Sequence, residues 1–429
     1  MISKKTPFSS YKAFYIMFLL LLGISTVVET INGFYIGLTR NIGLFCIGII
    51  ALAFVFLSTK RRCLFLFFRR SNSKLFTVFY FFIILCVFYI LISTFVRGRN
   101  IVDVLKTSYY YFLFFFVPVF AFIFKVGIIQ DRNFYVKNTM LISCCFDIIA
   151  IFFWLLVFAF GNEKLGFNVY TRSSIPRLMI DSGLLMISPV VSLYSLSINR
   201  YRRLAIFNLF TFFFNLVFIN QTRGYYLVYL MIIFSIFVVK QFRKKDAYKT
   251  SRFIFATFVV ALFLVGFLCC INAFGGLGLF SDKTVSFRIG TIGEYFSRFL
   301  KNPFFGFGFL PDKMDEIGFM ASYGFEGSMS HDDVGLLGIL DTFGIVGIVP
   351  IICILYFPFK VFRRTNNRKL LIPCLFIGFG LLYGCISLIA FNPTRFSFLV
   401  LIISLLCAIS SIEKTSIPHF TLKESQVYA

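Results

Sequence analysis

Long apolar stretches recur along the whole chain, and they restrict its fold more than any other feature. Runs of about 17 to 25 apolar residues match the length that a helix needs to cross a bilayer. Backbone polar groups in the hydrocarbon must be bonded within their own segment, so such runs are expected to be helical. Apolar residues make up 59% of the 429 residues and charged residues only 14%, unlike soluble domains. The sequence therefore predicts an all-α polytopic membrane protein.

About twelve transmembrane helices are expected within a single membrane domain over residues 1–429. The expected spans are 13–29, 42–58, 75–95, 108–124, 139–160, 178–198, 204–220, 225–239, 253–273, 335–358, 370–391 and 396–412. Residues 274–334, between the ninth and tenth spans, form the one long polar interruption. We expect this segment to be a large loop that contains short surface helices, including an amphipathic helix near 285–300 that Pro303 stops.

The distribution of basic residues predicts the orientation in the membrane. With both termini in the cytosol, the cytosolic segments hold 28 of the 42 Lys and Arg residues, and the outer segments hold the other 14. This excess on one side follows the positive-inside rule. The loop 274–334 then lies outside the cytosol. The net charge of +24 comes from clusters beside lipid headgroups, so no nucleic-acid partner is expected, whereas membrane lipids are.

Arginines in the outer segments are few, and they are the first candidates for ligand binding. Five of them are selected as candidates: Arg172 and Arg177 in the loop before the sixth span, Arg223 in the turn 221–224, Arg288 at the start of the predicted surface helix, and Arg395 after 392–394. Guanidinium groups bind phosphate oxygens bidentately and stay charged at any working pH. Such a set can clamp a lipid diphosphate. The alternative is that the side chains extend to the interface from helix ends.

His331 is the candidate for acid–base chemistry. It is one of two histidines, and it lies in the sequence Ser330-His331-Asp332-Asp333 at the end of the large loop. A histidine titrates near neutral pH and can take a proton from an attacking hydroxyl, while Asp332 or Asp333 orients the ring. The alternatives are an ordinary loop histidine that pairs with these acids, or a weak divalent-cation site. No cofactor and no bound metal are expected.

Two further features allow more than one interpretation. Asp147, Asp181 and Asp341 fall inside or at the edges of spans, where acids usually face the bundle interior, and this pattern is compatible with a proton-coupled transporter. Capping at broken helices explains Asp181 and Asp341 equally well. Gly306-Phe307-Gly308 lacks the strand and lysine of a nucleotide-binding loop, so it is interpreted as a turn or a close helix contact.

Three segments, taken in order, resemble the O-antigen ligase and polymerase superfamily of bacterial envelope glycosyltransferases. They are QTRGYY at 221–226, SFRIGTIGEYFSRFLKNPFFGFGF at 286–309 and SHDDVGLLGILDTFGIVGI at 330–348. The resemblance covers the C-terminal half in detail. The first half agrees in its number of spans and in an arginine-bearing outer loop before the sixth span.

The resemblance implies transfer of a glycan from undecaprenyl diphosphate on the outer face of the bacterial cytoplasmic (inner) membrane, without nucleotide sugar or metal. By motif, Arg223 and Arg288 correspond to the diphosphate-binding arginines of the family, and His331 to the histidine that activates the acceptor hydroxyl. Arg172, Arg177 and Arg395 are further candidates for substrate binding. A diphosphate leaving group gains negative charge as its bond breaks, and fixed cations can stabilise that charge.

Three functions follow in order of preference. The first is a polymerase of O-antigen, capsule or exopolysaccharide units, with a lipid-linked oligosaccharide as substrate and a flippase and a chain-length regulator as candidate protein partners. The second is a ligase that moves glycan to lipid A core. The third is a flippase or other transporter of lipid-linked oligosaccharide. Asp332 stands where ligases of the family commonly have asparagine, which favours the polymerase.

Overall fold

The computed structural model confirms a helical membrane protein. The structure describes residues 7–32, 36–58, 73–161, 169–172, 175–178, 188–189, 191–193, 195–196, 199–220, 293, 295–309, 336–364 and 396–415. Within these ranges, six helices are long and apolar enough to cross a membrane. The predicted spans 225–239, 253–273 and 370–391 lie outside the described residues, so the total of twelve stays a prediction.

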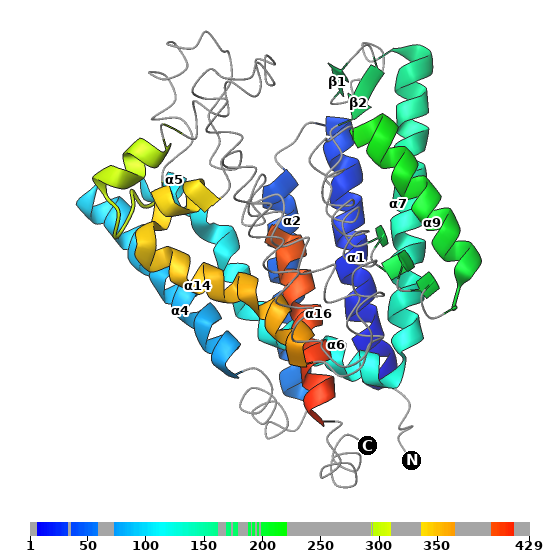
Figure 1. Cartoon of the computed structure of the whole chain (residues 1–429), viewed down its shortest axis with the longest axis horizontal. Helices are drawn as coiled ribbons and strands as arrows, with labels where there is room; N and C mark the ends of the chain where they lie inside the picture. Colours follow the sequence, from blue (N-terminus) through cyan, green and yellow to red (C-terminus); the bar gives the residue numbers. More distant parts are fainter. Residues whose placement is uncertain are drawn as a thin grey trace.

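The N-terminal half forms a run of helices that pass up and down the bundle (Figure 1). They are α1 (Pro7–Asn32), α2 (Ile36–Ser58), α4 (Ser73–Leu91) with the π-helical turn η1 (Ile92–Val96), α5 (Ile101–Ser108), the 3-10 segment η2 (Tyr109–Phe116), α6 (Val117–Gln130) and α7 (Arg132–Phe160). Each long helix follows an apolar run of the sequence. The predicted span 108–124 is divided, because η2 joins the short helix α5 to α6.

The described C-terminal elements are α9 (Arg202–Phe214), the π-helical turn η3 (Asn215–Asn220), α14 (Leu336–Arg364) and α16 (Phe396–Thr415). Helix α16 lies within the bundle in Figure 1 and is buried along almost its entire length. A helix that is apolar on all sides is expected in such a position. Its neighbours include α6, η2 and α14.

The start of α1 and the end of α16 lie at the same end of the bundle in Figure 1, whereas α5 and the start of α14 lie at the opposite end. This arrangement agrees with termini that share one side of the membrane. That this side is the cytosol stays a prediction from the basic residues.

One described element departs from the all-helical prediction. Strands β1 (Val169–Arg172) and β2 (Ile175–Leu178) form an antiparallel hairpin with Arg172 opposite Ile175. The loop before the sixth span therefore contains a small sheet. Val169, Tyr170 and Thr171 are residues that favour strands, and the short connection 173–174 permits a tight turn. Leu178 is fully buried in a cluster with Trp154 and Ile219, which fastens the hairpin to α7 and η3.

Reporter fusions test the orientation directly. Alkaline phosphatase fused after Glu326, in the large loop, is expected to be active, and green fluorescent protein at the same site is expected to be dark, because the basic residues predict that the loop lies outside the cytosol. Fusions after Arg364, at the other end of α14, are the matched control and should give the opposite pair of signals. Fluorescence without phosphatase activity at Glu326 would contradict the orientation.

Candidate functional site

The structure describes the framework around the nominated residues rather than their side chains. Six of them lie outside the described residues: Arg223, Arg288, His331, Asp332, Asp333 and Arg395. The other two, Arg172 and Arg177, occupy opposite strands of the hairpin, where Arg177 pairs with Tyr170. The hairpin places both backbone positions beside the C-terminal ends of α7 and η3.

Each nominated residue outside the described ranges comes shortly before or after a described element. Arg223 lies three residues beyond the end of η3, and His331 lies five residues before the start of α14. Arg288 lies five residues before Gly293, where described helical structure begins, and Arg395 directly precedes α16. The packing of η3, the surface helix, α14 and α16 therefore restricts where these four residues can lie.

The segment Asn302–Phe309 carries the glycine turn of the resemblance, and it begins where a surface helix ends. Residues 295–301 are helical, and the helix stops immediately before Asn302 and Pro303, as predicted. Gly306 and Gly308 have φ angles of +62° and +69°, a region that glycine adopts without strain. The prediction of a turn rather than a nucleotide loop is confirmed.

This turn fits into a break in helix α14. Gly344 interrupts the helix with φ +61° and ψ −165°, which frees carbonyls before it and amides after it. The backbone of the turn bonds these freed groups. The bonds, donor first, are Phe307 N to Asp341 O (2.6 Å), Gly308 N to Thr342 O (2.9 Å), Ile345 N to Pro303 O (2.9 Å) and Val346 N to Phe304 O (3.2 Å). We call this contact the turn–helix junction.

Close backbone approach makes the junction intolerant of side chains. A Cβ atom on Gly306 would lie 2.5 Å from the carbonyl oxygen of Asp341, and one on Gly344 would lie 2.3 Å from that of Phe304. Neither oxygen can move without breaking the backbone bonds of the junction. The glycines at these two positions are therefore required by packing as well as by φ.

Gly306→Ala is expected to lower the free energy of unfolding by about 1 to 3 kcal/mol more than Gly98→Ala does. Both glycines have positive φ, so both variants carry backbone strain, but a Cβ on Gly98 meets nothing within 4 Å. Thermal unfolding of the two purified variants in detergent measures the difference. Equal losses of stability would show that the close contact at Gly306 is not present.

Two arginines from the distant N-terminal half hold the turn from its other side. Arg97 donates from Nη2 to Gly306 O at 2.9 Å and from Nη1 to Phe307 O, and its guanidinium lies 5.2 Å from the centre of the Phe307 ring. Arg99 donates from Nη1 to Phe309 O at 2.5 Å. Burial lowers the pKa of the Arg97 guanidinium from its ordinary value, and the nearby Asp341 carboxylate opposes this shift.

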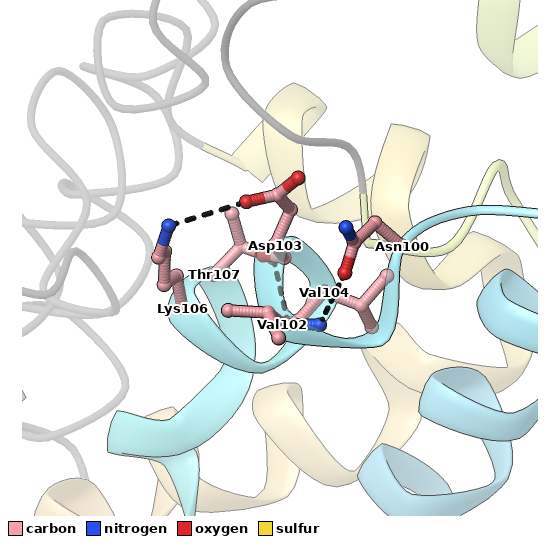
Figure 2. A network of polar contacts seen from close by, with 6 residues as sticks. All are labelled: Asn100, Val102, Asp103, Val104, Lys106 and Thr107. Atoms are coloured by element: carbon pink, nitrogen blue, oxygen red, sulfur yellow. Dashed lines mark hydrogen bonds and ion pairs between the residues drawn. The ribbon is translucent and has the colours of Figure 1, made fainter.

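The local sequence positions these arginines just beyond the C-terminal end of α4 and η1. Residues 97–99 follow the π-helical turn η1 and precede α5. The side chain of Asn100 caps the N-terminus of α5 by accepting a hydrogen bond from the amide of Val102 at 2.9 Å (Figure 2). Within α5, Lys106 pairs with Asp103 at 3.3 Å. The turn with both arginines is thus fixed between two helical elements.

An ion pair links the surface helix to α14. Arg298 Nε lies 3.3 Å from Oδ1 of Asp341, whose side chain is fully buried. The guanidinium also lies 5.6 Å from the ring centre of Tyr295 and 5.2 Å from that of Phe307. A buried carboxylate needs a partner of this kind. Asp341 therefore belongs to the broken helix, in agreement with the structural interpretation of this acid rather than with transport.

Aromatic side chains connect the junction to the start of α16. Phe309 and Phe343 pack edge to face with ring centres 5.4 Å apart, and Tyr111 contacts both rings at 5.8 and 5.6 Å. Tyr111 also packs edge to face on Phe396 at 5.4 Å. Because Arg395 directly precedes Phe396, the backbone that carries this arginine is fastened to the same aromatic cluster.

Comparison with known families agrees with this geometry. Residues 207–352 match the family model Wzy_C, described as O-antigen ligase. The matched segment belongs to the O-antigen ligase family. It contains the three motif segments of the resemblance, both sides of the turn–helix junction, Arg223, Arg288 and His331. The predicted resemblance to the O-antigen ligase and polymerase superfamily is thereby confirmed over residues 207–352. No curated protein sequence matches the chain.

Arg97 and Arg99 were missed by sequence reasoning, and they lie outside the segment that matches the O-antigen ligase family. Their bonds reach partners more than 200 positions away along the chain. The sequence Arg97-Gly98-Arg99 could have indicated them, because it follows a predicted span on the side where few basic residues are expected.

Arg97→Ala is expected to loosen the turn–helix junction. Loss of a charge-assisted donor to two carbonyl groups is expected to lower the free energy of opening the junction by about 2 kcal/mol. Backbone amides of residues 306–309 should then exchange hydrogen faster, as measured by mass spectrometry of peptides from this segment. Lys106→Ala, which removes an exposed cation from α5, is the control and should leave this exchange unchanged. Unchanged exchange in Arg97→Ala would exclude an anchoring role.

Proposed function

We propose that this protein is a polysaccharide polymerase formed by a single transmembrane glycosyltransferase domain. It transfers a glycan from undecaprenyl diphosphate to a sugar hydroxyl of another lipid-linked repeat unit, on the outer face of the bacterial cytoplasmic membrane. The observation that carries the proposal is the turn–helix junction within the O-antigen ligase match. The junction fastens the helix that follows Arg288 to the helix that follows His331.

The roles of the arginines follow from the chemistry of the donor. The bond between the anomeric carbon and the diphosphate oxygen breaks, and the leaving group gains negative charge. Arg223 and Arg288 bind the diphosphate oxygens and stabilise that charge, because fixed guanidinium groups need no reorganisation as the reaction proceeds. Arg172, Arg177 and Arg395 are further candidates for contact with the headgroup or the sugar.

His331 acts on the acceptor. Its neutral imidazole takes the proton of the acceptor hydroxyl while the oxygen forms the new glycosidic bond. Asp332 or Asp333 orients the ring by accepting the hydrogen of its other nitrogen. The products are the lengthened glycan on one lipid carrier and undecaprenyl diphosphate from the other, so the roles need neither a nucleotide sugar nor a metal.

A second candidate is the ligase reaction, because the matched family model is described as O-antigen ligase. A ligase would use the same donor and the same three residues but would transfer the glycan to lipid A core. Only the acceptor distinguishes the two functions. Asp332, in place of the asparagine common in ligases, favours the polymerase.

Deletion of the gene in its own bacterium, with complementation, separates the two functions. Loss of a polymerase leaves surface glycans of a single repeat, whereas loss of a ligase leaves long polymer on the lipid carrier and none on lipid A core. We expect single repeats, and restoration of the ladder by the wild-type gene. Long carrier-linked polymer in the deletion strain would establish the ligase instead.

A further inference from the structure

Helices α7 and α9 lie side by side, away from α14 (Figure 1), and a buried polar cluster lies between them. Helix α7 contributes Ser143 and Asp147, one turn apart on the same face. The helix α9 and the turn η3 contribute positions that also share one face. These positions are Asn208, Thr211 and Asn215. All five side chains are at most 4% exposed, so the cluster is shielded from both lipid and water.

The side-chain amide nitrogens of Asn208 and Asn215 donate hydrogen bonds to neighbouring oxygens. Asn215 donates from Nδ2 to Oδ1 of Asp147 at 3.0 Å. Asn208 donates from Nδ2 to the hydroxyls of Ser188 and Ser192, each at 2.7 Å. Both hydrogens of the Asn208 amide and one of the Asn215 amide are therefore donated to oxygen acceptors within the protein.

Oxygen atoms remain without a partner. Among the described residues, the buried oxygens that no donor reaches include Oδ2 of Asp147, Oδ1 of Asn215, Oδ1 of Asn208 and Oγ of Ser143. No described basic side chain pairs with Asp147. A buried carboxylate with unsatisfied amide oxygens nearby is costly unless a positive group offsets the charge. The unsatisfied oxygens of the cluster are therefore available to bind a cation.

We propose that this cluster binds a small monovalent cation, Na⁺, through Asp147, Asn215 and Ser143, with Asn208 at the edge of the site. Hard cations prefer carboxylate, amide and hydroxyl oxygens, which are the groups left unsatisfied here. One carboxylate supplies a single negative charge, which matches a monovalent rather than a divalent ion. The inference does not depend on the proposed polymerase activity.

The backbone at the cluster agrees with a ligand site. The α-helical hydrogen bonding of α9 changes to the π-helical turn η3 at Asn215 itself. Local π-helical turns occur frequently at functional sites. Since η3 ends three residues before Arg223, a cation that fixes Asn215 also stabilises the chain end that leads to the 221–224 turn.

The single tryptophan of the chain provides a direct probe. Trp154 lies on α7, two turns beyond Asp147, and its ring packs at 5.8 Å against Phe214, the residue before Asn215. Purified protein in detergent is titrated with NaCl against choline chloride at constant ionic strength, and Trp154 fluorescence and the thermal unfolding midpoint are followed. We expect a saturable change with Na⁺ and a higher unfolding midpoint.

Asp147→Asn keeps the size of the side chain but removes its charge, and it should weaken the apparent Na⁺ affinity by about tenfold or more. Ser143→Ala removes one neutral ligand and should weaken it by less, which keeps the proposal testable if Asp147→Asn does not fold. Asp103→Asn, the same change on the exposed helix α5, should leave the titration unchanged. The absence of any Na⁺-specific change in wild-type protein would overturn the proposal. So would a titration that Asp147→Asn leaves intact, or a response to protons alone.

Discussion

Replacement of His331 by Ala is expected to lower the rate of glycan transfer by about 10²- to 10⁴-fold, because a positioned general base contributes that much to a proton transfer. Binding of the lipid-linked donor should be largely retained, since it depends on the arginines. His331→Gln should be as inactive. His331→Asn can keep a hydrogen bond to the acceptor but cannot take the proton, so it should be nearly as inactive.

Initial rates with purified protein, together with a separate measurement of donor binding, test this prediction. His419→Ala, which removes the other histidine of the chain, is the matched control and should keep wild-type turnover. Full activity of all His331 variants would leave positioning by the arginines as the main source of catalysis. Activity that EDTA abolishes and Mg²⁺ restores would instead assign Asp332 and Asp333 as metal ligands.

Removal of either proposed diphosphate-binding arginine should have an effect of similar size. Arg223→Ala and Arg288→Ala are each expected to reduce transfer by about 10²- to 10³-fold, which abolishes a visible glycan ladder in cells. Lysine at either position should restore little activity, because a point charge does not reproduce the bidentate geometry of guanidinium.

The test is the glycan ladder at matched protein levels. Arg203→Ala removes an exposed arginine at the start of α9, the end of that helix away from η3, and should leave the ladder intact. Normal ladders in both Arg223→Ala and Arg288→Ala would exclude diphosphate binding by these residues. A loss in Arg288→Ala alone would leave the surface helix as the only donor-binding element.

The membrane architecture was largely predictable because the bilayer permits few solutions for an apolar run. The expected spans near 42–58, 75–95 and 139–160 correspond to α2, α4 with η1, and α7, and the structure extends each by a few residues. The turn at Gly306 and Gly308 was also predictable, since Pro303 ends a helix and glycines permit positive φ.

Features that depend on distant contacts were not predictable. Asp341 was the only local sign of a broken helix in α14, and the sequence did not show that the segment 303–308 fills the break at Gly344. The anchoring by Arg97 and Arg99 depends on carbonyl groups far along the chain, and carbonyl groups carry no sequence signature. The hairpin of β1 and β2 was not predicted, because each strand is only four residues long and its pairing depends on the partner strand.

The central claim is that the protein lengthens a lipid-linked glycan. The most direct measurement supplies purified protein in detergent with a synthetic undecaprenyl-diphosphate-linked repeat unit as both donor and acceptor, in the presence of EDTA, and resolves the products by mass. We expect a series of products that differ by one repeat unit each, and loss of that series in Arg288→Ala and His331→Ala. Repeat units that stay single, but are transferred to lipid A core when it is added, would contradict it.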